Sequence, residues 1–233
     1  MILRTEERPM GEMTVGRQFQ SLRDLVCNDL RTRIIEGLLL PGERLVERDL
    51  AEELEVSRIV VREAIQQLVA EKLVVVLPRR GAQVASMDER DIAELFQVRL
   101  NLESLAARCA AENRTDADLA RLKDVFDAAT SAAQAGDVSE ATRLNVEFHF
   151  AIVDACGNDL LASIMRSLKG PVRRVFRMTQ DSVAVDPGAD HAALLKAITD
   201  HDAETAGRLA YDHIEATRLP TLEHVAKLAA DAQ

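Results

Sequence analysis

The histidines are the residues of this chain best suited to bind a metal ion. All five follow residue 148, and three of them are His149, His191 and His213. Asn145 precedes His149 by four residues, so on a helix the amide oxygen and the imidazole share one face. Three neutral imidazoles and an oxygen donor can hold a divalent transition ion if the fold brings them together. On spacing alone, ordinary hydrogen-bonded histidines remain the other interpretation.

A second group of polar residues, in the first third of the chain, is suited to DNA. Arg58, Arg62 and Gln66 recur at i, i+4 and i+8 in SRIVVREAIQQLVAEKL and form a polar stripe on the predicted helix. An arginine can pair bidentately with guanine or bind phosphate, and a glutamine can read adenine. The same helix turns a separate apolar face toward the core, and that face is formed by Val61, Ile65 and Leu68.

Other residues around this helix are placed to contact the DNA backbone or an adjacent groove. Ser57 stands at the helix N-terminus, where a hydroxyl and free amides suit a phosphate. Arg48 lies on the preceding helix, within reach of the backbone or the groove edge. Arg79 and Arg80 are expected at the tip of a β-hairpin and suit the minor groove, where Gly81 allows close approach.

The elements that position these residues can be read from hydrophobic spacing and turn residues. A helical pattern runs from near Gly16 to Gly37, and further helices are expected from Glu47 to about Leu54 and from Ser57 to about Lys72. Two β-rich runs, 73–77 and 82–85, then flank the turn 78–81. From Asp88 onward the chain reads as six helices with short connections, near 88–113, 115–135, 137–156, 158–181, 188–201 and 202–229.

The predicted fold class is mainly α. We expect a flexible arm over residues 1–15 and a winged helix-turn-helix with a small β-hairpin wing over 16–86. An antiparallel all-α bundle is expected over 88–230. The helix–turn–helix, the polar stripe and the basic hairpin tip together indicate a domain whose second helix enters the major groove of DNA.

The charge of the chain is distributed unevenly between these two parts. The net charge is −10, which argues against a protein that coats nucleic acid indiscriminately. Residues 1–87 carry 13 Lys and Arg against 14 Asp and Glu, whereas the remainder carries 16 against 25. The predicted DNA-binding part is therefore close to neutral. The remainder of the chain is acidic and repels DNA, so nonspecific DNA binding is restricted to the first part.

The segment LVERDLAEELEVSRIVVREAIQQLVAEKLVVVLPRRGAQV resembles the winged-helix signature of GntR-type regulators, and IIEGLLLPGERL upstream resembles the same family. The resemblance implies that Arg48, Ser57, Arg58, Arg62 and Gly81 touch DNA. The chain departs from the family pattern at three positions. Val46 replaces a polar helix cap, Glu55 stands where glycine is common in a left-handed turn, and Val60 stands where Pro or Thr is common.

Residues from about 88 to 225 resemble the helical effector domain of the FadR branch of these regulators, also called the FCD domain. The resemblance rests on VRLNLESLAARCAAE, NVEFHFAIVDACGNDLL, DHAALLKAI and AYDHI. It implies a metal site, for zinc or nickel, formed by Asn145, His149, His191 and His213. Many members have Asp at the first of these positions, so the amide here lowers the negative charge of the site.

A metal ion with open coordination positions can bind a carboxylate directly, so we expect a small organic acid as the effector. Arg99 is the predicted second anchor for that acid, since Arg pairs bidentately with carboxylates. The alternative for Arg99 is an ion pair with Glu103 one helical turn later. His201 and His224 do not fall on the metal-binding pattern and are read as surface residues.

We therefore expect a DNA-binding transcriptional regulator, and by its architecture a repressor, that acts as a homodimer on a near-palindromic operator. The sequence predicts a cytoplasmic protein that does not span the membrane. Its three cysteines are far apart, it has no signal peptide, and no apolar run approaches about 18 residues. Three alternatives remain open: a regulator that senses the metal alone, a metal-free domain that binds a larger acyl ligand, and a zinc hydrolase. The last lacks a motif such as HExxH and leaves the DNA-binding part unexplained.

Overall fold

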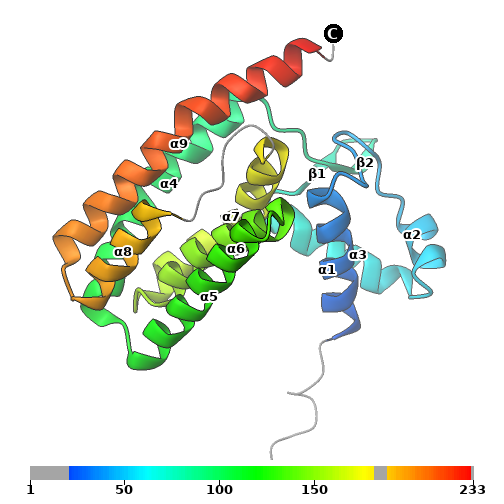
Figure 1. Ribbon diagram of the computed structural model, residues 1–233. Helices are drawn as coiled ribbons and strands as arrows, with labels where there is room; N and C mark the ends of the chain where they lie inside the picture. The colour runs from blue at the N-terminus through cyan, green and yellow to red at the C-terminus, as the bar shows by residue number, and fades with distance from the viewer. Residues whose placement is uncertain (1–20, 181–187, 232–233) are drawn as a thin grey trace, which may run out of the picture.

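The computed structural model describes residues 21–180 and 188–231, and within them the chain forms two helical units of different size (Figure 1). We call the smaller unit, residues 22–84, the head, and the larger one, residues 89–231, the bundle. The predicted fold class, a winged helix-turn-helix followed by an all-α bundle, is confirmed. The expected arm over residues 1–15 lies outside the described residues.

The head contains helices α1 (Leu22–Ile35), α2 (Glu47–Glu53) and α3 (Arg58–Ala70), followed by strands β1 (Val74–Leu77) and β2 (Gly81–Val84). The helix α1 begins at Leu22, later than the pattern from Gly16 predicted. The reason is local: Ser21 has extended backbone angles, and its side chain caps the helix by accepting a hydrogen bond from the Asp24 amide.

The two strands form the antiparallel hairpin that the sequence predicted. Val74 pairs with Val84 at one end, and Leu77 pairs with Gly81 at the turn. The head core lies between the three helices and the base of this hairpin, where Leu30, Val61 and Leu68 are fully buried. This core fixes α3 and leaves its opposite face exposed to solvent.

The bundle consists of α4 (Glu89–Asn113), α5 (Asp116–Gln134), α6 (Val138–Asp154), α7 (Asp159–Thr179), α8 (Ala189–Thr199) and α9 (Ala203–Asp231). The long helices α4 and α9 run antiparallel to each other, and α5 packs along α6 (Figure 1). Within the described ranges, no helix combines the length and the apolar character needed to cross a membrane.

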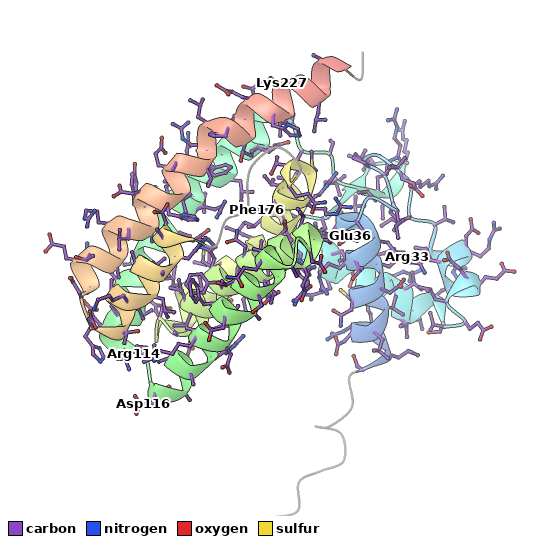
Figure 2. All side chains as sticks on the ribbon, viewed as in Figure 1. Arg33, Glu36, Arg114, Asp116, Phe176 and Lys227 are labelled. Carbon is purple, nitrogen blue, oxygen red and sulfur yellow. The ribbon has the colours of Figure 1, made fainter. Side chains whose placement is uncertain are left out.

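The helix α7 lies between the rest of the bundle and the head. Arg174 is buried and donates a hydrogen bond to the backbone carbonyl of Ala85, at the end of the wing. Arg177 pairs at 2.9 Å with Glu36, the residue that directly follows α1 (Figure 2). A side chain at Gly170 would collide with Leu73, since its Cβ would lie 2.8 Å from Leu73 Cδ1. The head therefore contacts the bundle mainly through one helix.

The turn between α2 and α3 gives a first testable prediction. Glu55 has a φ angle of 53°, in the left-handed region that disfavours side chains with a Cβ. We expect Glu55→Gly to raise the free energy of unfolding by up to about 1 kcal/mol, because glycine removes this strain. Denaturant unfolding measures the change. Glu55→Ala is the control: it keeps the Cβ, so a gain as large as that of glycine would show that strain is not the cause.

Candidate metal centre and nucleic-acid interface

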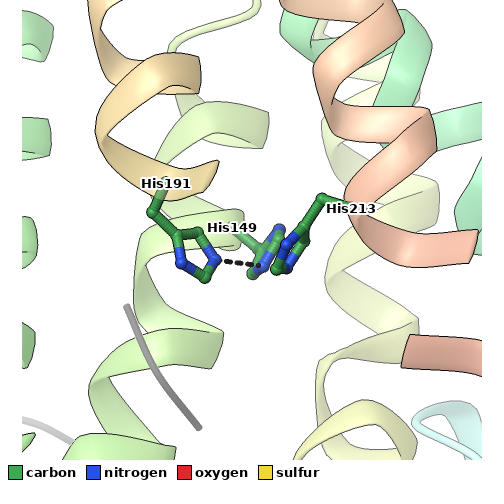
Figure 3. A group of neighbouring side chains, drawn as sticks. All are labelled: His149, His191 and His213. Atoms are coloured by element: carbon green, nitrogen blue, oxygen red, sulfur yellow. Dashed lines mark hydrogen bonds between the residues drawn. The ribbon is translucent and has the colours of Figure 1, made fainter. Parts of the chain in front are cut away.

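The three histidines predicted as metal ligands meet inside the bundle, each from a different helix (Figure 3). His149 lies on α6, His191 in the first turn of α8, and His213 on α9. One ring nitrogen from each lies within 4.8 Å of those of the other two. The Nε2 atoms of His149 and His191 are 3.3 Å apart. The fold thus gathers three residues that are spread over more than sixty positions of the sequence, from 149 to 213.

These distances suit a tetrahedral ion. Nitrogen ligands about 2.0–2.1 Å from a tetrahedral zinc ion lie about 3.3 Å from one another. His149 and His191 already have this separation. The ring of His213 is stacked against His149 with its centroid 5.2 Å away, and its ligand nitrogen lies within 4.8 Å of those of the other two histidines. The donor set therefore fits a transition metal of the zinc type.

The protonation of His213 is compatible with metal binding. Burial, assisted by the neighbouring His149 and Arg99, lowers the pKa of His213 to about 3. The imidazole is consequently neutral in ordinary conditions, and one ring nitrogen carries a lone pair that a metal can accept. The other two imidazoles, of His149 and His191, are only 4% and 2% exposed.

Glu103 of α4 orients His149. Its Oε2 atom lies 3.0 Å from His149 Nδ1, and both side chains are buried. A carboxylate at Nδ1 favours the tautomer that leaves Nε2 free to face the other histidines. Burial on its own raises the pKa of Glu103, but the neighbouring Arg99 and His149 hold it at about 2, so the group is ionised.

The sequence analysis did not assign Glu103 to the metal site. The available signal was its position, because Glu103 falls on the apolar stripe of α4, in register with Phe96, Leu100 and Ala107. A carboxylate on the buried face of a helix needs a partner. The identity of that partner could not be found by spacing, because His149 lies on another helix.

Asn145, the fourth predicted ligand, lies on α6 one turn before His149 and is 4% exposed. Its Oδ1 atom is buried and has no hydrogen-bond donor among the described residues. A buried amide oxygen without a donor is costly, so the site favours a ligand that this oxygen can bind, such as a metal ion or its bound water.

Arg99 is buried against the same network. Its Nε atom donates to Glu103 Oε1 at 2.7 Å, and its guanidinium lies 5.1 Å from the ring centres of both Phe96 and Phe176. Of the two roles considered for Arg99, the structure shows the ion pair with Glu103. Contact between Arg99 and an organic acid stays a prediction.

The polar stripe of α3 is exposed as predicted. Arg58, Arg62 and Gln66 face solvent, whereas the apolar face of the helix is buried in the head. Ser57 caps the helix by accepting a hydrogen bond from the Val60 amide at 3.4 Å. The stripe and the cap are therefore accessible to solvent, with Ser57 and Arg58 at the N-terminal end of α3 and Gln66 past its middle.

A carboxylate already holds Arg62 in this structure. Both Nε and Nη2 of Arg62 donate to Glu47, at 2.9 and 2.7 Å, and Arg58 lies 3.9 Å from the same carboxylate. Hydrogen bonding to Arg62 in turn lowers the pKa of Glu47. The sequence analysis missed Glu47, because the contact depends on the angle at which α2 meets α3.

The remaining residues predicted to contact DNA surround this stripe. Arg48 on α2 is exposed and pairs with Asp49 at 2.9 Å, while Val46 gives α2 no side-chain cap, as expected. Arg79 and Arg80 are exposed in the turn of the hairpin. Both Arg79 and Gly81 have positive φ angles, 64° and 77°, which form this tight tip.

Comparisons with known proteins agree with this arrangement. Residues 22–84 match the model for bacterial regulatory proteins of the gntR family, and residues 94–216 match the FCD domain. The chain is 33% identical over 148 residues to the HTH-type transcriptional regulator McbR of Escherichia coli, covering 64% of this chain and 67% of that protein. It is 33% identical over 151 residues to the gluconate operon transcriptional repressor of Bacillus subtilis, covering 65% of this chain and 61% of the repressor. The solved structure of E. coli McbR/YncC aligns with a TM-score of 0.69 at 27% identity, over 92% of this chain and 100% of that one.

Proposed function

The chain belongs to the gntR family of bacterial regulatory proteins and carries an FCD domain, so it is a transcriptional regulator and not an enzyme, and we propose that a metal-bound organic acid controls its affinity for operator DNA. The single observation that carries this proposal is the group of three imidazole nitrogens within 4.8 Å of one another. The hydrolase alternative is set aside, because the family and its relatives are regulators.

The proposed metal ligands are His149, His191, His213 and Asn145, and zinc or nickel are the ions that such a set favours. An ion held by three imidazoles keeps open positions at which a carboxylate can bind. The contact of Glu103 with Nδ1 of His149 supports this role, since it points the other ring nitrogen toward the site.

The proposed effector is a small organic acid, with Arg99 as its second anchor. An arginine has five donor hydrogens, and Glu103 accepts from Nε, so other guanidinium donors remain for a ligand. A rearranged Arg99 would also disturb Phe176 on α7, whose ring it contacts. The same helix holds the head through Arg174 and Arg177. Ligand binding can thereby favour one placement of the heads over another.

The proposed DNA target is a near-palindromic operator bound by a homodimer through two heads. One helix in the major groove contacts a short half-site, so useful affinity needs a second copy. We propose that the bundle supplies the dimer contact and that the regulator is a repressor, as its relative is for a gluconate operon.

The test is operator binding by full-length protein, measured with and without metal and acid. The acids are acetate, succinate and gluconate, with glucose as the uncharged control. We expect at least one acid to change operator affinity by about 5–150-fold, the usual range of allosteric coupling, and only in the metal-loaded protein. The same effect in protein treated with EDTA, or no effect of any acid, would contradict the proposal.

A second candidate, a regulator that responds to the metal alone, is favoured by one observation. Arg99 already has a carboxylate partner in Glu103, so it does not require an acid ligand. In that case operator affinity will follow the zinc or nickel concentration in the absence of any organic acid.

A further inference from the structure

A groove of about 560 Å³ separates the head from the bundle, away from the histidines. Arg31 of α1 and Glu71 beyond α3 line its head wall, and Glu147, Lys169 and Arg173 line its bundle wall. The volume falls within the range of about 300–1,000 Å³ typical of small-molecule sites. The groove shares no lining residue with the proposed metal site.

Charges in and around this groove are paired with one exception. Four carboxylates lie near Arg173, and each of them pairs with a different cation at 2.7 to 2.9 Å. Among the described residues, no hydrogen bond or ion pair joins Arg173 to any of these acids or to another group. The four pairs are Glu71 with Arg31, Glu140 with Arg143, Glu147 with Lys169, and Glu36 with Arg177.

The environment of Arg173 makes this unpaired charge costly. The side chain is half-buried, and burial is the main cause that lowers its pKa. The nearby carboxylates of Glu147 and Glu36 oppose this effect, whereas Arg143 and Arg31 add to it, and the pKa stays below its ordinary value. A cation removed from water without a partner is unfavourable, so an added anion would stabilise the site.

A second observation comes from the other side of Arg173. Arg173 also lines a small pocket of about 50 Å³ together with Thr142 and Arg177. Thr142 is 4% exposed, and its hydroxyl has no hydrogen-bond partner in the part of the chain that the structure describes. Thr142 therefore lies at this small pocket and not in the groove. Arg173 borders both hollows, and only the groove has the room that an organic anion needs.

We propose that this groove binds a small organic anion, whose acidic group pairs with Arg173. The occupant is not DNA, because the head wall of the groove is the C-terminal end of α3, whereas the exposed arginines Arg58 and Arg62 are at the other end. The groove walls belong to the head and to the bundle. A bound anion therefore bridges the two units and forms a second ligand site for the regulator.

The test uses full-length protein freed of metal with EDTA, so that anions cannot bind at the histidines. Its melting temperature is measured against increasing inorganic phosphate, and separately against succinate, with sodium chloride keeping the ionic strength constant. Binding to the native state raises the melting temperature along a saturation curve. We expect Arg173→Gln to require about tenfold more anion, or more, for the same rise, because a charge-assisted bidentate contact is lost.

The matched control is Arg90→Gln, which removes an exposed arginine outside the groove and should respond like the original protein. Arg173→Lys keeps the positive charge but loses the planar guanidinium that can donate two parallel hydrogen bonds. We therefore expect its affinity for the anion to lie between those of Arg173→Gln and the original protein. Equal anion affinity in Arg173→Gln and the original protein would overturn the proposal. So would a lack of saturable response to both anions, or a response that requires added metal.

Discussion

Replacing Arg62 by alanine will weaken operator binding by about 100-fold or more while the protein keeps its fold. Arg62 lies at the centre of the exposed stripe of α3, the helix that such heads place in the major groove. One bidentate contact from arginine to guanine discriminates by about 10- to 100-fold, and two heads of a dimer lose it twice. A gel-shift titration with operator DNA at fixed salt measures the loss.

The control for this prediction is Arg90→Ala. Arg90 is also an exposed arginine paired with a glutamate, here Glu94 at 2.9 Å, but it lies on the bundle. Both variants change the net charge equally, so a general charge effect would weaken them alike. Unchanged operator affinity in Arg62→Ala, with a normal circular dichroism spectrum, would reject α3 as the helix that contacts DNA.

Removing His149 will abolish metal binding. His149 is the histidine whose second nitrogen faces Glu103, and its Nε2 lies 3.3 Å from His191. The variant keeps two of the three imidazoles. Loss of a residue that only hydrogen-bonds to a metal ligand typically lowers metal affinity by roughly 10–100-fold, so loss of a ligand itself should lower it further. Metal content after dialysis against zinc or nickel, measured by mass spectrometry, should drop from about one ion per chain to none in His149→Ala.

Two further variants make this result interpretable. His224→Ala removes a histidine of α9 that is not part of the group and should retain the metal. His213→Ala removes the least buried ligand and should lose it even if His149→Ala proves unstable. Operator binding itself should persist in all three, because the head is unchanged. Failure of the original protein to bind any transition metal would refute the metal site.

The helices of the bundle could be predicted closely because their ends carry local signals. Asp88 and Thr115 each form a reciprocal capping box, and Asn158 caps α7 through its side chain. Gly136 and Gly157 have positive φ angles just after α5 and α6. These signals act within a few residues, so the sequence alone was enough to find them.

Contacts between distant elements could not be predicted in the same way. The pairing of Glu47 with Arg62 and of Glu103 with His149 depends on how two helices cross, which no local pattern encodes. The groove at Arg173 depends further on how the head sits against α7. The proximity of the three histidines was expected only because the chain resembles a family that binds metal.

The carboxylate of Glu47 has a consequence for how the regulator would search a genome. A guanidinium already held at two nitrogens gains little by moving to an isolated phosphate, and the glutamate beside it repels the backbone of unrelated DNA. Release of Arg62 becomes favourable where a base offers two well-placed acceptors in return. On DNA of unrelated sequence the head would then bind weakly and slide rapidly. The protein would stop where the bases match its operator.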